Sequence, residues 1–142
     1  MQLSSEVKLT KVEDHTAAGT TDVDSASVDM AGFEGVLFLT SFGTAATNNY
    51  ISVQTSSDDG SADTFTDLTG TKVGATASDE DVWVDVLRPR ERYLRVHVEL
   101  GTSSTVESIW AIQYGARKLP VDNTTTGTII GEAWVSPAEG TA

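Results

Sequence analysis

The chain has 142 residues, carries a formal net charge of −12 and contains no cysteine. This length suits one domain with a core of its own, and the absence of cysteine excludes disulfide bridges, thiol catalysis and thiolate metal sites. So acidic a chain should repel nucleic acid and anionic membrane surfaces, and we expect neither as a partner.

The N-terminal sequence MQLSSEVKLTK lacks a basic start followed by an apolar core, so it predicts no signal peptide. No apolar run approaches the length of about 18 residues that a membrane-spanning helix needs. Weak alternation predicts a first strand over residues 6–12, followed by a polar loop over residues 15–25 and a short strand over residues 27–30.

The run GVLFLTSF at residues 35–42 is apolar on both faces, which predicts a central strand that is covered on both sides. The next strand is predicted over residues 49–56, where Ile51, Val53 and Thr55 fall on the core face. The SDDG sequence that follows is typical of a turn, and residues 64–68 predict a weaker strand.

In the segment VWVDV, Val82, Val84 and Val86 share one face of a predicted strand, and Trp83 lies on the other. The basic connector RPRER follows, and its proline bars it from a strand interior. Residues 93–100 alternate most clearly, with four aliphatic side chains expected to point inward: Leu94, Val96, Val98 and Leu100.

The last strong strand is predicted over residues 107–114, where Trp110, Ile112 and Tyr114 share a face and Trp110 is expected in the core. No stretch shows a helical period. The chain is therefore predicted to be all-β. We expect a single β-sandwich or jelly-roll-like barrel body over residues 1–115 and an extended C-terminal arm over residues 116–142.

Two acidic segments raise the question of a cation site. Asp58, Asp59, Asp63 and Asp67 could supply the clustered oxygen ligands that calcium prefers, but their spacing does not match the EF-hand pattern. Asp and Gly at these positions favour a hairpin turn, and the acidic residues 79–81 favour a solvated loop. We therefore predict no metal site and no cofactor.

The sequence contains only two histidines, His15 and His97, and neither is part of a recognisable catalytic pattern. His15 falls in the polar loop, and His97 falls between Arg95 and Glu99 on the outward side of its strand. A nucleophile elbow, a phosphate-binding loop and an H-E-x-x-H motif are all missing from the sequence. The prediction is a protein without enzymatic activity.

Candidate interface residues come from two places. The first is the basic cluster of Arg88, Arg90, Arg92 and Arg95, which is either a solvated loop or a contact with the acidic residues 79–81 of a neighbouring subunit. The second is the arm, where Ile129, Ile130 and Trp134 are apolar anchors that a free tail does not need. Trp83, Trp110 and Trp134 could alternatively form a sugar-stacking platform, although exposed tryptophan more often marks a protein interface.

Three segments carry a resemblance to a known class of proteins. They are GFEGVLFLTSFGTAATNNYISVQTSSDDGSADTFTDL, DVLRPRERYLRVHVEL and the terminal SPAEGT. With these segments the chain resembles small virion structural proteins of tailed bacteriophages, in particular head decoration (cement) proteins, over most of residues 30–142.

The resemblance implies binding rather than catalysis. The protein would clamp neighbouring major capsid subunits on the capsid exterior and stabilise the shell. It would associate with itself as a homotrimer or another homo-oligomer and be made in the host cytoplasm. The alternatives are a tail or head–tail completion protein of the virion and a carbohydrate-binding module on a virion or cell surface.

Overall fold

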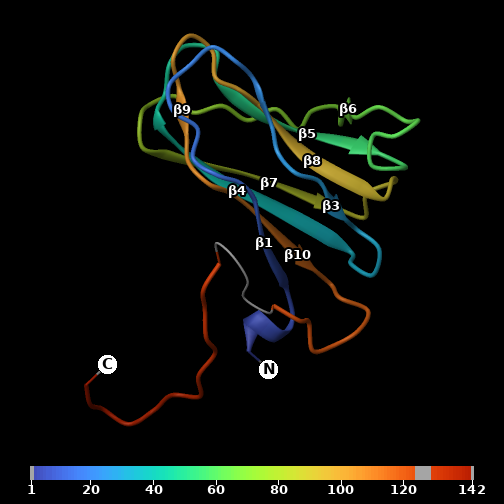
Figure 1. Cartoon of the computed structure of the whole chain (residues 1–142), viewed down its shortest axis with the longest axis vertical. Coiled ribbons are helices and arrows are strands. Elements are labelled where there is room, and N and C mark those ends of the chain that lie inside the picture. Colours follow the sequence, from blue (N-terminus) through green and yellow to red (C-terminus); the bar gives the residue numbers. More distant parts are fainter. Residues whose placement is uncertain (1, 124–128, 142) are drawn as a thin grey trace.

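A computed structural model describes residues 2–123 and 129–141. In this part of the chain, two antiparallel five-stranded sheets pack face to face (Figure 1). The prediction of an all-β sandwich is confirmed. The helical content is one short 3-10 helix, η1 (Leu3–Ser5), which precedes the first strand.

The first sheet, sheet A, has the strand order β1-β10-β4-β7, and β9 pairs with the end of β4. These strands are β1 (Lys8–Glu13), β4 (Gly35–Thr44), β7 (Glu80–Leu87), β9 (Thr105–Val106) and β10 (Ile109–Tyr114). The second, sheet B, has the order β2-β8-β5-β6, and β3 pairs with β8. Its strands are β2 (Val23–Asp24), β3 (Val28–Asp29), β5 (Tyr50–Ser56), β6 (Thr66–Asp67) and β8 (Tyr93–Glu99).

The core lies between the sheets and is built by side chains at every second position, because successive residues of a strand point to opposite faces. Phe38 and Phe42 of β4 and Leu94 of β8 are fully buried there. The aliphatic residues predicted to face the core from residues 49–56 and 93–100 are buried as expected: Ile51, Val53, Leu94, Val96, Val98 and Leu100.

The long predicted strands are confirmed, and two of the very short ones were missed. β2 lies inside the segment that we predicted to be a loop, and β9 begins within residues 102–105, which the sequence predicts to be a turn. Each is only two residues long. A period cannot show in two residues, so these strands depend on their neighbours in the sheet rather than on local sequence.

Two expectations about side-chain burial were wrong. Trp110 is not in the core, because the core face of β10 is formed by Ile109, Ala111 and Gln113. The buried Gln113 amide donates a 2.8 Å hydrogen bond to the backbone oxygen of Asp29. This bond satisfies the polar side chain inside the core. Strand β4 is covered on its core face only, since Leu37 and Leu39 on its other face are partly exposed.

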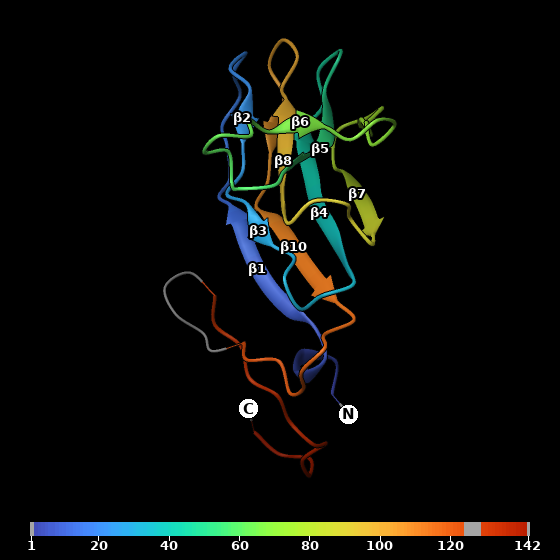
Figure 2. The same cartoon turned by 90° about the vertical axis from the view of Figure 1, so that its right-hand side faces the viewer.

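Beyond β10, the described residues form neither strand nor helix, and the chain first runs along the body. The Arg117 amide donates to the oxygen of Gly32, and the Val121 amide donates to the oxygen of Ser5. The Asn123 side chain accepts from the Leu9 amide at 2.9 Å. The chain then leaves the sandwich at the end where the N-terminus lies (Figures 1 and 2). Residues 124–128 and 142 of the predicted arm lie outside the described residues.

Candidate binding surface

The outward side of sheet A is largely apolar, and the strand register shows why. Paired residues of neighbouring strands have side chains on the same face. One cross-strand row contains Lys11, Trp110, Leu39 and Trp83, and the adjacent row contains Leu9, Ile112, Leu37 and Asp85. We call the six apolar residues of these rows the outer face of sheet A; Lys11 and Asp85 lie at its two edges.

Most side chains of this face are partly buried by one another, but its edge at β7 is open. Trp83 is 59 % exposed. Leu87 lies four residues later on the same face of β7 and is also 59 % exposed. Contiguous apolar patches of this kind on a folded protein mark sites of interaction. The sheet face is therefore the strongest candidate binding surface of the chain.

The outward side of sheet B is polar, in contrast to the outward side of sheet A. Gln54, Arg95 and His97 are outward-facing in β5 and β8, and Arg95 donates a 2.8 Å hydrogen bond to Gln54. An antiparallel sheet commonly has one solvated polar face and one face on the core. Sheet B follows this pattern, whereas sheet A has apolar residues on both faces.

Polar groups border the outer face of sheet A. The Tyr114 hydroxyl donates a 2.6 Å hydrogen bond to Asp85, and burial together with this carboxylate raises the pKa of Tyr114 to about 12. At the other end, Leu39 and Trp110 help to line a shallow depression of about 300 Å³. Such an apolar centre with a polar rim is the usual anatomy of a protein interface.

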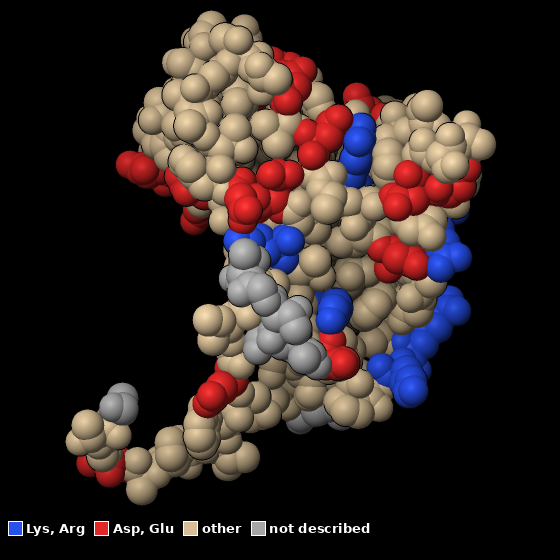
Figure 3. Space-filling model, viewed as in Figure 1, with Lys and Arg blue, Asp and Glu red and all other residues tan. Residues whose placement is uncertain are grey.

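The four predicted arginines differ in how far they are available to a partner. Arg92 forms a two-bond pair with Asp29, at 2.8 Å and 2.7 Å, which lowers the pKa of Asp29. Arg95 is half-buried and pairs with Asp24 at 3.0 Å. Arg88 and Arg90 are exposed and make no ion pair with any residue of the described ranges. Basic side chains gather along one edge of the body (Figure 3).

The predicted partner of these arginines, residues 79–81, lies at the far end of the same strand. Glu80 begins β7 and Arg88 follows its last residue, so about 25 Å of extended chain separates them. The Glu80 carboxylate accepts hydrogen bonds from the amides of Thr76 and Ala77, and Asp81 accepts one from the Ser41 hydroxyl. A contact between the two segments therefore requires a second copy of the chain and remains a prediction.

The apolar anchors predicted in the arm are largely uncovered. Ile130 is 93 % exposed and Trp134 is 69 % exposed, whereas Ile129 is half-buried. Val135 joins them as a further exposed apolar residue. The backbone oxygen of Trp134 accepts a 2.7 Å hydrogen bond from Gln2, so the body holds the backbone of this segment and leaves the apolar side chains outward.

The acidic turn after β5 is organised by one carboxylate. Asp58 accepts hydrogen bonds from the backbone amides of Ser61 and Asp63, each at 3.1 Å, and from Ala62 at 2.8 Å. These bonds lower the pKa of Asp58. Gly60 has a positive φ of 77°, a conformation that glycine adopts without steric cost. The carboxylate closes the turn, in line with the hairpin interpretation.

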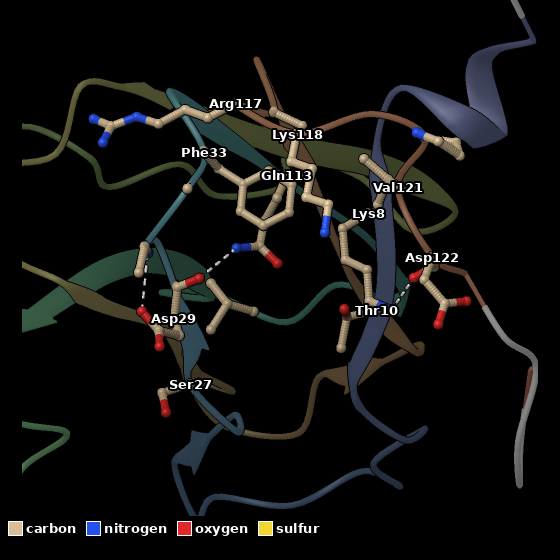
Figure 4. A pocket seen from close by; sticks show the side chains of 15 residues that line it. Lys8, Thr10, Ser27, Asp29, Phe33, Gln113, Arg117, Lys118, Val121 and Asp122 are labelled. Carbon is tan, nitrogen blue, oxygen red and sulfur yellow. Dashed lines mark hydrogen bonds between the residues drawn. The ribbon is translucent and has the colours of Figure 1, made fainter.

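A groove of about 610 Å³ lies between β1, β3 and the segment that follows β10. Figure 4 shows Lys8 and Gln113 in this groove, bonded to the backbone of Asp122 and Asp29 respectively. The Lys8 bond attaches the start of the C-terminal segment to β1, whereas the Gln113 bond joins β10 to β3. The groove is therefore part of the mechanical anchorage of the arm.

His97 lies on sheet B, and His15 lies near one end of the outer face of sheet A, since its partner Glu107 lines the same depression as Leu39 and Trp110. His15 contacts Glu107 at 3.1 Å, and His97 contacts Asp24 at 2.7 Å. Neither contacts a serine or threonine hydroxyl among the described residues, so the structure brings no triad together there. Within the described ranges, no helix is long and apolar enough to cross a membrane.

The sequence signal for the outer face of sheet A was the GVLF run, which is apolar on both faces. This pattern predicts a central strand that is covered on both sides. No described residues cover the outward side of β4, so the apolar side chains on that side are partly exposed. No protein-family model matches the chain, and no curated protein matches it either.

Proposed function

We propose that this chain is a non-enzymatic structural protein of a phage virion that decorates the capsid exterior. It binds neighbouring major capsid subunits and further copies of itself, and it needs no cofactor. The observation that carries this proposal is the apolar outer face of sheet A, which includes the exposed Trp83. An apolar face shared by four strands suits a broad protein partner better than a small molecule, which needs a concave pocket.

The rest of the chain supports a role in binding. The sandwich provides a rigid body, because its core side chains are fully buried between two sheets. The arm adds exposed apolar anchors at Ile130 and Trp134, which can reach a subunit that the body does not touch. Arg88 and Arg90 add positive charge to an otherwise acidic chain and give orientation to a contact with an acidic partner.

A carbohydrate-binding module is the second candidate, and the exposure of Trp83 favours it. An exposed indole on a strand can stack against a sugar ring, and Asp85 lies on the same face to accept hydroxyl hydrogen bonds. A glycan array separates the two functions. Sugar binding that disappears in Trp83→Thr, with capsid binding unchanged, would support the module and remove the decoration role from this face.

The decisive experiment for the proposal uses particles assembled without this chain. Purified protein is added back, and its location and copy number are determined by electron cryo-microscopy of the particles. We expect density on the capsid exterior and a copy number comparable with that of the major capsid protein. A few copies at one vertex or in the tail would instead identify a completion protein, and absence of any density would overturn the assignment to the virion.

A further inference from the structure

A group of metal-ligating side chains lies on sheet B, well away from the surfaces described above. It consists of Asp22, just before β2, and of His97 and Glu99 on β8. One ligand atom of each residue lies within 4.8 Å of the others. His97 Nε2 and Asp22 Oδ2 are 3.8 Å apart. This distance is too long for a hydrogen bond.

The imidazole of His97 is already oriented for ligation by a fourth residue. Asp24 Oδ1 lies 2.7 Å from His97 Nδ1, and a carboxylate oxygen accepts, so Nδ1 carries the proton. Asp24 is itself held by Arg95 through its other oxygen, at 3.0 Å. The lone pair of neutral His97 is therefore on Nε2, which faces Asp22. A carboxylate behind a histidine is the usual arrangement around a metal-bound imidazole.

We propose that Asp22, His97 and Glu99 bind one divalent transition-metal ion of the Zn²⁺ class, with Asp24 as a positioning residue. Zinc binds histidine nitrogen and carboxylate oxygen at about 2.0–2.2 Å, so neighbouring ligands around a tetrahedral ion lie about 3.3 Å apart. The separation of His97 Nε2 and Asp22 Oδ2 exceeds this value by about 0.5 Å, and no separation in the group exceeds it by more than about 1.5 Å. Rotation of the two carboxylate side chains closes this gap, and water completes the coordination.

The surroundings of the site favour a cation of this kind. The His97 side chain is only 19 % exposed, and the ring of Tyr50 lies beside it with a centroid distance of 6.4 Å. The carboxylates of Asp22 and Glu99 place negative charge beside this imidazole, and that charge attracts a cation. An imidazole ligand selects zinc over calcium and magnesium, which prefer oxygen ligands only.

A bound metal ion would connect the chain before β2 to β8, two parts that otherwise share few hydrogen bonds. β2 has two residues and pairs with β8 at Val23 and Asp24 only. An ion held by Asp22 on one side and by His97 and Glu99 on the other links the chain before β2 to the middle of sheet B. Because ligands that bind only the folded state stabilise it, zinc should raise the melting temperature. This inference does not depend on the function proposed above.

The test is calorimetric titration of the full chain with ZnCl₂ at pH 7. We expect saturable binding of one ion per chain. His97→Gln should abolish it, and Asp24→Asn should weaken it by about 10- to 100-fold. His15→Gln is the matched control, because His15 also contacts one carboxylate, Glu107, but lacks the other ligands, and it should bind as the wild type does.

A second measurement needs no variant. The two histidines give separate imidazole nitrogen resonances, and zinc should shift Nε2 of His97 while leaving His15 unchanged. The proposal is overturned if the wild type shows no saturable zinc binding, if His97→Gln binds equally well, or if Ca²⁺ competes at equal concentration. The last two outcomes would mean that the carboxylates bind cations through charge alone.

Discussion

Replacing Trp83 tests the central functional idea, because this residue is the most exposed aromatic side chain of sheet A. Its neighbours Val82 and Val84 are buried on the core face, whereas the indole is outward and 59 % exposed. Trp83→Thr keeps a residue with high strand propensity at the position. The change should therefore alter the surface while the sandwich stays folded.

The size of the effect follows from the area available to a partner. A tryptophan side chain presents up to about 250 Å², so 59 % exposure leaves about 150 Å² to be covered by the partner. At about 25 cal/mol per Å², covering this area contributes about 3.7 kcal/mol, which corresponds to about a 500-fold change in Kd. The stability of the isolated protein should change by no more than about 0.5 kcal/mol.

Binding is measured by co-sedimentation of the protein with particles assembled without it, and stability is measured by denaturant unfolding. Tyr93→Thr, an aromatic residue of β8 on the opposite sheet, is the matched control and should bind normally. Normal binding of Trp83→Thr, together with weakened binding of Tyr93→Thr, would show that the wrong face had been chosen. Equal loss in both variants would indicate damage to the fold.

Three further results are expected. Truncation after Asn123, whose side chain still holds the Leu9 amide, should leave the melting temperature nearly unchanged and reduce particle binding at least tenfold, whereas unchanged binding would remove the arm from the interface. Phe38→Ala should lower the free energy of unfolding by about 3–5 kcal/mol, because the side chain is fully buried; a loss below about 1 kcal/mol in denaturant unfolding would contradict its place in the core. Absorbance titration should show one tyrosine with a pKa of about 12, which is absent in Tyr114→Phe. This pKa is raised above its unfolded value of 10.0. The stabilisation of the folded state by the Tyr114–Asp85 bond is therefore complete below pH 10 and is lost as the pH rises towards 12. A measured Tyr114 pKa near 10 would refute this bond.

The long strands could be predicted from sequence because their side-chain alternation is set by the core itself. Leu94, Val96 and Val98 repeat every second residue, and all three are fully buried. The sandwich follows from such strands and the turns between them. The pairing order could not be predicted in this way, because β1 lies beside β10 at the other end of the sequence, and alternation says nothing about which strands become neighbours.

The candidate surface was harder to predict, for a physical reason. In β10 the bulky Trp110 and Ile112 lie outward, while the small Ala111 and the polar Gln113 lie inward. Sequence pattern assigns the bulkier face to the core, so it reverses this strand. Only the register with β4, which pairs Trp110 with Leu39, shows that the apolar residues of several strands form one outward surface.

The arginine cluster shows the same limit in another form. Arg88, Arg90, Arg92 and Arg95 look equivalent in sequence, but Arg92 and Arg95 are committed to Asp29 and Asp24. These partners lie far away in the chain and become near only when β2 and β3 join β8. Ion pairs between residues far apart in the chain leave no local sequence signal. Only the fold shows which arginine side chains are available to a partner.

The attachment of the C-terminal segment to the N-terminal one has a practical consequence for engineering. Asn123 donates to the backbone oxygens of Ser4 and Val7 at 2.7 Å, so the two chain ends leave the sandwich at one pole. Loops project from the opposite pole (Figure 2). A reporter fused to either terminus therefore occupies the same side of the molecule. Peptides for display belong in the loops at the other pole, such as the loop between β8 and β9, where they stay clear of both termini.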